Sequence, residues 1–136
     1  MPAFTKVDAF VEALAEKVHN LGADSLKIAL TNTAHNAVWD QLADLTEVAY
    51  TFCSSRAVTI SSSAQTSGTY KLVLADLTLT ATGGSVGPFR YVYLYNDTPA
   101  GKDLIGYIDY GSAITLLDTE TLLIDFDATN GVMTLA

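Results

Sequence analysis

The first third of the chain opens with a helical pattern of apolar residues. Five of them recur at spacings of three and four: Val7, Phe10, Val11, Leu14 and Val18. Such spacing places them on one side of an amphipathic helix. Thr5, with Asp8 three residues later, resembles a capping box, and Gly22 suits the left-handed residue that ends a helix. We therefore predict a helix that begins after Thr5, ends in segment 19–22 and packs on the rest of the chain.

After residue 22 the apolar period changes from 3.6 residues to two, which predicts β-strands. Leu26, Ile28 and Leu30 alternate with other residues in a strand over 25–30. Further strands are predicted over 57–60, 69–74, 77–81, 89–95, 104–110, 122–126 and 132–135. Asn130-Gly131 lies between the last two and predicts a hairpin turn. Gly83-Gly84 and Gly87-Pro88 predict a turn or loop.

Residues 33–50 fit neither period clearly. They hold Trp39, Leu42 and Leu45 among polar residues, which is compatible with a short helix or with a long surface loop. We expect a loop with one helical turn near 40–44.

A leading helix followed by short strands and turns is typical of a mainly β fold with a minor α part. We expect an antiparallel β-sandwich or barrel that carries one N-terminal amphipathic helix. The chain shows no internal repeat and no linker, and its 136 residues suit a single domain. Within that domain, 1–22 form an N-terminal arm and helix, and 23–136 form the β domain.

Charge narrows the class of partner. Seven Lys and Arg against 15 Asp and Glu give a net charge of −8, which argues against binding to nucleic acid or to an anionic membrane surface. The N-terminus lacks the pattern of a signal peptide, and the apolar runs are too short to cross a bilayer. Charged residues make up only 16% of the chain, whereas about 25% is usual. Either the β surface is neutral and Thr-rich, or part of it contacts protein.

The residues that usually carry chemistry show no productive spacing. His19 and His35 stand apart from any metal-ligand pattern, and the single Cys53 can form neither an internal disulfide nor a cysteine-based zinc site. The pattern Gly83-x-Ser85-x-Gly87 matches a hydrolase nucleophile motif, but it lies between two predicted antiparallel strands, not at a strand-to-helix turn. We therefore expect no catalytic residue, no metal site and no cofactor.

Acidic residues are concentrated in the C-terminal third: Asp103, Asp109, Asp118, Glu120, Asp125 and Asp127. A calcium loop would need the rest of the twelve-residue pattern, which is missing here. A glycosidase would need two of these carboxyl groups together in a cleft. Acids on strand faces and in turns explain the pattern better.

The strand over 89–95 places four aromatic rings on one face: Phe89, Tyr91, Tyr93 and Tyr95. Three interpretations remain open for this face, namely half of a sandwich core, a protein interface, or a platform on which a sugar stacks. A platform for nucleic acid bases would need the opposite net charge.

Several blocks of the sequence together resemble the small structural proteins of tailed bacteriophages. These blocks are residues 4–7, 19–22, 26–32, 87–97 and 104–111, which read FTKV, HNLG, LKIALTN, GPFRYVYLYND and LIGYIDYG. Among such proteins the chain is most similar to capsid decoration, or cement, proteins. The resemblance implies a β-rich protein without enzymatic activity. Such a protein binds to the outer shell of the virion after assembly in the bacterial host cytoplasm.

On that hypothesis the partners are the major capsid protein and further copies of this chain, in a homo-oligomer such as a trimer. The candidate interface consists of Phe4, Val7, Phe10, Phe89, Tyr91, Tyr93, Tyr95 and Tyr107, with residues 1–22 as the capsid contact. One alternative is a phage tail component, such as a tail-tip or fibre-associated β domain that contacts the host through Tyr93 or Tyr107. Alternatives from other classes are a carbohydrate-binding module and a small glycan-directed enzyme.

Overall fold

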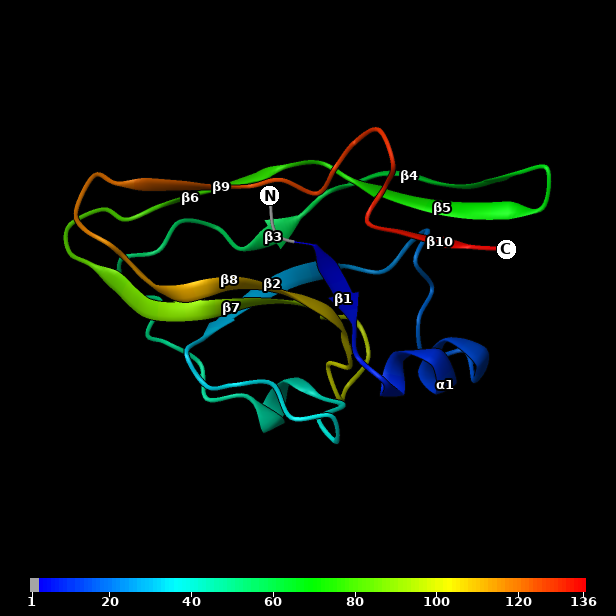
Figure 1. Ribbon diagram of the computed structural model, residues 1–136, viewed down its shortest axis with the longest axis horizontal. Coiled ribbons are helices and arrows are strands. Elements are labelled where there is room, and N and C mark those ends of the chain that lie inside the picture. Colours follow the sequence, from blue (N-terminus) through cyan, green and yellow to red (C-terminus); the bar gives the residue numbers. More distant parts are fainter. Residues whose placement is uncertain (1–2) are drawn as a thin grey trace.

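The computed structural model describes residues 3–136 and shows antiparallel strands in two layers with one short α-helix (Figure 1). This confirms the predicted fold class, a mainly β protein with an N-terminal helix. The described strands form sheets of five, three and two strands that do not close into a barrel. Of the two predicted architectures, the layered one is therefore correct.

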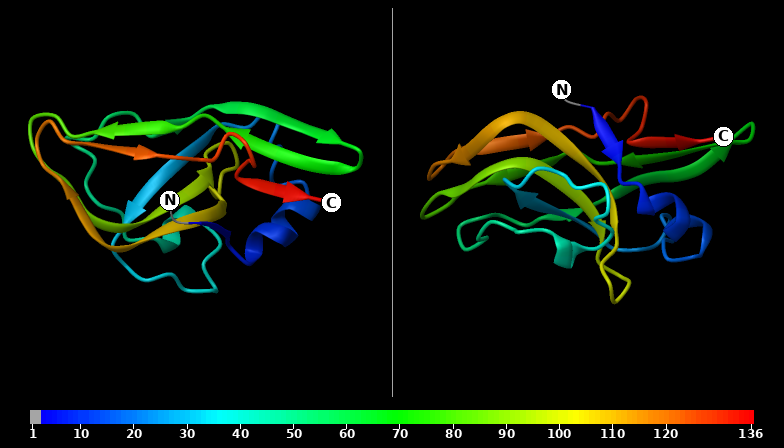
Figure 2. Two further views of the ribbon diagram at one scale, coloured as in Figure 1. Left: turned by 45° about the horizontal axis from the view of Figure 1, so that its top comes forward. Right: turned by 60° about the horizontal axis from the view of Figure 1, so that its bottom comes forward.

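The first layer is the five-stranded sheet, in the order β1-β8-β7-β2-β3. Its strands are β1 (Phe4–Lys6), β8 (Leu104–Leu116), β7 (Val86–Asn96), β2 (Leu26–Thr31) and β3 (Ala57–Val58). The two longest strands, β7 and β8, pair with each other at the centre. The register between them shifts at three places, so both strands bend around the core, as Figure 2 shows.

The second layer contains two smaller sheets that lie end to end along the long axis of the molecule (Figure 1). One has the order β10-β5-β4, with β4 (Ile60–Thr66), β5 (Thr69–Leu74) and β10 (Met133–Leu135). The other pairs β6 (Leu77–Thr80) with β9 (Thr121–Ile124). Leu79 and Ile124 are fully buried, while their neighbours Thr78 and Leu123 are exposed. This alternation shows that one face of the layer packs on the five-stranded sheet and the other faces solvent.

The N-terminal helix is shorter than predicted. The helix α1 spans only Ala9–Ala15, and residues 4–6 form the edge strand β1 instead of a capping turn. Phe4, Thr5 and Lys6 lie opposite Ile108, Tyr107 and Gly106 of β8. An edge strand satisfies its backbone groups against the neighbouring strand, which the start of a free helix cannot do. The predicted Thr5 cap is therefore wrong.

The N-terminal arm is in consequence part of the fold. A Cβ atom at Gly106 would collide with the Phe4 ring and with the Thr5 carbonyl oxygen, so the glycine leaves the space in which β1 lies. Val7 and Phe10 are buried, whereas Val11, predicted on the same apolar side, is 54% exposed. Residues 4–10 are thus packed into the β domain, although the sequence pattern predicted them as part of a distinct N-terminal arm and helix.

The predicted C-terminal hairpin is also wrong, although the turn exists. The Asp127 carbonyl oxygen accepts a hydrogen bond from the Gly131 amide, and the Asp127 side chain accepts two from Asn130. The strands on either side do not pair with each other: β9 pairs with β6, and β10 pairs with β5. Val132 donates its amide proton to Leu72, so the turn carries the chain from one small sheet to the other.

Residues 33–50, called the strap from here on, cross the outer face of the five-stranded sheet (Figure 2, right). A single 3-10 turn, η1 (Leu42–Asp44), interrupts the strap, which confirms the predicted helical turn near 40–44. The Val48 amide donates to the Leu30 carbonyl oxygen and the Thr31 hydroxyl donates to the Thr46 carbonyl oxygen. These bonds attach the strap along β2.

Candidate functional site

The strap covers two of the aromatic rings that the sequence singled out, Tyr93 and Tyr107. His35 of the strap lies with its Nδ1 2.6 Å from the Tyr93 hydroxyl oxygen, and its ring stacks on Tyr107 with 4.4 Å between centroids. Trp39 lies edge-on to the His35 ring at 5.9 Å. Tyr91 meets Tyr107 at 6.3 Å. The five rings form one cluster between the strap and the sheet.

Burial decides among the three interpretations of the aromatic strand. Phe89, Tyr91, Tyr93 and Tyr95 are all buried, with exposed fractions from 0% to 7%. All four rings therefore belong to the buried core, but Tyr93 packs under the strap on the outer face of the five-stranded sheet, not between two layers as a sandwich core requires. This strand presents no exposed ring on which a sugar could stack. Of the other candidate interface residues, Val7 and Phe10 are buried, while Phe4 and Tyr107 are half-buried. Six of the eight candidate interface residues are thus buried within the chain, and two keep part of their surface exposed.

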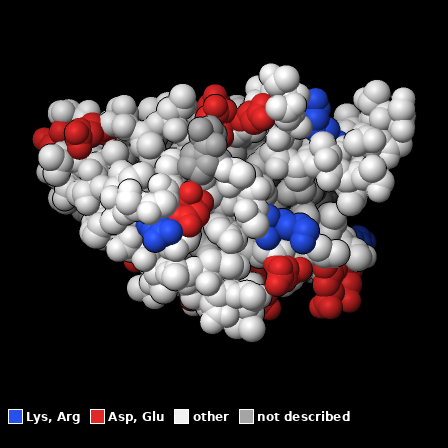
Figure 3. All heavy atoms as spheres, viewed as in Figure 1, with Lys and Arg blue, Asp and Glu red and all other residues white. Residues whose placement is uncertain are grey.

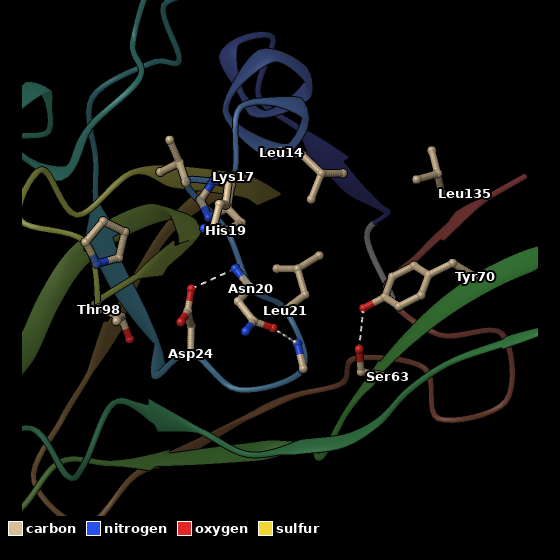
Figure 4. A pocket seen from close by; sticks show the side chains of 13 residues that line it. Leu14, Lys17, His19, Asn20, Leu21, Asp24, Ser63, Tyr70, Thr98 and Leu135 are labelled. Carbon is tan, nitrogen blue, oxygen red and sulfur yellow. Dashed lines mark hydrogen bonds between the residues drawn. The ribbon is translucent and has the colours of Figure 1, made fainter.

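A cleft of about 730 Å³ opens on another side of the molecule, between the chain that follows α1 and the β4–β5 hairpin (Figure 4). Its apolar walls consist of Leu14, Val18, Leu21, Tyr70, Pro99 and Leu135. In Figure 4, Leu14, Tyr70 and Leu135 line one side, and His19 and Asp24 lie on the other. The Ser63 and Tyr70 hydroxyl groups form a hydrogen bond with each other at 2.7 Å.

Three polar residues, His19, Asp24 and Asn96, form a hydrogen-bonded group beside this cleft, called the polar node here. The Asn96 side-chain amide donates to Asp24 Oδ2 at 2.7 Å and to His19 Nδ1 at 3.1 Å. Because the carboxylate can only accept, the orientation of the Asn96 amide is determined, and the His19 proton resides on Nε2. Asp24 also accepts from the Asn20 amide at 2.8 Å.

The polar node is a structural group. Asn96 is fully buried and its Oδ1 accepts a hydrogen bond from the Thr98 amide. Both the nitrogen and the oxygen of the Asn96 side chain therefore already have partners within the chain. Burial lowers the pKa of His19, opposed by the charges of Asp103 and Asp24. The His19 Nε2 atom is buried and has no partner among the described residues. A neutral histidine held in this way positions segment 19–24 against β7.

Both histidines make stability depend on pH. Burial is the largest cause that lowers the pKa of His19 and of His35 below the ordinary value of 6.5. The unfolded chain therefore binds protons at a higher pH than the folded chain does, so this contribution to stability is present above pH 6.5 and decreases as the pH falls below it. We expect the urea concentration at the unfolding midpoint to decrease when the pH is lowered from about 7 to about 5.5.

The measurement is a series of urea unfolding curves across that range. His35→Phe keeps a ring against Tyr107 and removes one titrating group, so its midpoint should depend less on pH than that of the parent chain. An unchanged pH dependence in this variant would contradict the role given to His35.

The acidic residues of the C-terminal third lie in separate places. Arg90 pairs with both oxygens of Asp109, at 2.8 and 3.1 Å, and its hydrogen bond lowers the pKa of that carboxyl group. Asp118 accepts from the Gly83 amide, and Glu120 accepts from the Leu117 amide, both in turns. Across residues 3–136 no three His, Cys, Asp or Glu side chains gather in a group that could hold a metal ion.

Two further sequence signals have ordinary structural settings. Gly83 and Ser85 lie in the connection between β6 and β7, as expected. Gly87 and Pro88 lie within β7, so the turn or loop predicted at these two residues is wrong. Cys53 is half-buried, and burial raises the pKa of its thiol.

The sequence patterns did not single out Asn96 or Asp24. They are 72 residues apart, and the residues around each indicate only turns. The one local signal is the short polar run at 19–24, where the Asn20 side chain also accepts from the Gly22 amide. Nothing in the sequence relates that run to the end of β7, because the strand pairing that brings them together is tertiary.

Comparisons with protein-family models, curated proteins and solved structures found no match to this chain. In the part of the chain that the structure describes, no helix has the length and hydrophobicity needed to cross a membrane.

Proposed function

We propose that this chain is a non-enzymatic structural protein of a tailed-bacteriophage virion, a capsid decoration protein that binds the outer shell and stabilises it. The phage-like blocks support this proposal through their place in the fold. Blocks 4–7, 26–32, 87–97 and 104–111 contain β1, β2, β7 and most of the described length of β8. The resemblance thus covers four strands of the five-stranded sheet, which is the frame of the molecule.

The observation that carries the proposal is exposed apolar surface on a fold whose core is already complete. Among the described residues the large apolar side chains that are exposed are Val11, Val38, Phe52, Leu117, Leu123 and Leu135. Three of them, Phe52, Leu117 and Leu123, lie on β9 or on segments hydrogen-bonded next to β6 and β9. We call these three residues the apolar end. Thr82 donates to the Phe52 carbonyl oxygen, and Leu123 lies opposite Thr78.

Leu117 is connected to the same end by its turn. Its carbonyl oxygen accepts from Glu120, and Ala81 exchanges hydrogen bonds with Thr119 and Glu120. Leu117 is 59% exposed. Exposed apolar side chains on segments that are hydrogen-bonded to one another favour a protein partner there.

The charge distribution agrees with a place on the outside of a shell. Figure 3 shows a few Lys and Arg residues, some of them beside acidic residues, with wide uncharged areas between the charged groups on the face in view. With a net charge of −8 the chain is repelled by DNA. Many copies, each with a modest interface, stabilise a shell together because the contacts are multivalent.

The N-terminal segment 1–22 is less suited to be the capsid contact than its sequence indicated. β1 pairs with β8, and Val7 and Phe10 are buried in the core. A deletion of 1–22 would remove an edge strand and open the core, so loss of binding would not identify a contact. Substitutions on the exposed surface provide the cleaner test.

The experiment that tests the proposal is the copy number of this chain in purified virions, measured by quantitative mass spectrometry against the major capsid protein. A ratio near one per capsid subunit, or a simple fraction set by the lattice, is the expected result. A handful of copies per virion would assign the chain to the tail, and absence from virions would reject both roles.

A substitution at the apolar end should weaken capsid binding. We expect Leu117→Asp to lower the occupancy on virions by about tenfold, because an interface anchor is replaced by a charge. Val38→Asp is the matched control, since Val38 is 79% exposed in the strap, on the other side of the five-stranded sheet. Equal occupancy of the two variants, with thermal unfolding unchanged in both, would show that the apolar end does not bind the shell.

A further inference from the structure

The strand β4 has one open edge. It pairs with β5 on one side, and no described strand pairs with it on the other. The remaining edge strands are shorter: β3 has two residues, β1 and β10 have three, and β6 and β9 have four, against seven in β4. In Figures 1 and 2 the β4–β5 hairpin extends outward at one end of the molecule. A Cβ atom added to Gly68 at its tip would meet no other part of the chain within 4 Å.

The hairpin geometry shows which backbone groups point toward the open edge. Ser67 and Gly68 both have positive φ, 52° and 84°, as in a two-residue type I′ turn. The flanking pair Thr66 and Thr69 then exchanges backbone hydrogen bonds, and pairing alternates along the strands. The N–H and C=O groups of Ser63 and Gln65 therefore point away from β5. No backbone partner for them is found within residues 3–136.

This edge lacks the features that usually prevent two strands from joining. Natural edges carry charged residues or proline, or are very short. β4 reads ISSSAQT, with neither a charge nor a proline, and its one irregularity lies at its start, between Ile60 and Ser62. Residues 64–66 are exposed to solvent and carry no charge. In a chain of net charge −8, a neutral strand is the place where two copies meet with the least repulsion.

We propose that β4 is a self-association edge, where two copies of this chain pair antiparallel about a two-fold axis through Ala64. Ser63 of one copy then lies opposite Gln65 of the other, and each such pair exchanges two backbone hydrogen bonds. The same surface serves both copies, so the contact closes as a dimer. The occupant is a second copy because every residue that meets across the axis is uncharged and none is large.

The first test is a cross-link at the axis. The two Ala64 residues form a pair without backbone hydrogen bonds, with Cα atoms about 4.5 Å apart, which lies in the range that a disulfide spans. In a Cys53→Ser background, Ala64→Cys is expected to form an intermolecular disulfide on mild oxidation. Thr69→Cys is the matched control, because Thr69 is also exposed but lies on β5, away from the open edge. No cross-link at Ala64, or an equal yield at Thr69, would overturn the proposal.

The second test is the oligomeric state of the purified chain by sedimentation over a range of concentrations. A dimer is expected, and Ala64→Lys should weaken it by about tenfold or more, because two like charges then meet at the axis. Thr69→Lys, with the same change in charge, should leave it intact. A monomer at every concentration, a trimer, or equal effects of the two variants would refute the edge pairing.

These tests use no virions. Their outcome is therefore independent of the proposed function. Whether or not the chain is found in virions, the cross-linking and sedimentation results test the pairing of β4 by themselves.

Discussion

Replacement of Tyr93 by alanine is expected to lower the free energy of unfolding by about 3 to 5 kcal/mol, the range for deletion of a large buried ring. Tyr93 is fully buried at the centre of the aromatic cluster and contacts His35, Trp39 and Tyr107. Its loss leaves a cavity under the strap and removes the hydroxyl group that lies 2.6 Å from His35 Nδ1. We expect the strap to detach before the rest of the chain unfolds.

The measurement is urea unfolding followed by two signals. Trp39 is the single tryptophan and lies in the strap, so its fluorescence reports the strap, while circular dichroism reports the strands. In Tyr93→Ala the fluorescence midpoint should fall below the dichroism midpoint. Tyr93→Phe, which keeps the ring, should cost only about 1 kcal/mol. Coincident transitions in Tyr93→Ala, with stability close to that of the parent chain, would show that the cluster does not hold the strap.

Asn96→Ala is expected to cost about 2 to 4 kcal/mol, because it disrupts the polar node inside the protein. Asn96 donates to Asp24 and His19 and accepts from the Thr98 amide, and all its groups are buried. After the substitution His19 Nδ1 has lost its donor in an environment with little water. Segment 19–24 should loosen from β7 in consequence.

The check is the free energy of unfolding together with hydrogen exchange of the amides in 19–25. Asn36→Ala is the control, since Asn36 accepts one exposed hydrogen bond from the Val38 amide, and its removal should cost about 0.5 kcal/mol. If both variants lose the same small amount and exchange in 19–25 is unchanged, the polar node contributes no more than a surface turn.

The strands that the sequence predicted well are those with clear alternation. Thr69–Leu74 is a strand as predicted, and Leu77–Thr80 ends one residue before the predicted limit. In β6, Leu79 is buried and Thr78 is exposed, so one face meets the core and the other meets water. A pattern of period two arises for that physical reason and can be detected without the fold.

Where both faces of a strand are covered, the pattern was less informative. Ala29 and Thr31 of β2 are fully buried, like Ile28 and Leu30, because the strap covers the outer face of this strand. The aromatic strand left three interpretations open for the same reason. A row of rings is compatible with a core or with an interface, and only the position of the strap distinguishes them.

The wrong predictions arose at local signals that tertiary contacts overrode. Segment 4–8 has a helix-start pattern, but Phe4–Lys6 gains backbone partners along β8. The Asn130-Gly131 turn forms, yet the strands beside it find partners elsewhere in the sequence. Short segments have weak intrinsic preferences, so pairing with an available strand decides their structure.

The sequence by itself determined the mainly β class, the sign of the charge and the turn near 40–44, because each follows from local residue types and their period. Only the tertiary structure decided that the strap packs on Tyr93 and Tyr107, that Asn96 joins His19 and Asp24, and that β4 is left with an open edge. Each of these features depends on contacts between residues that are far apart in the sequence. Core packing and strand pairing over the whole chain determine those contacts, and no local pattern records them.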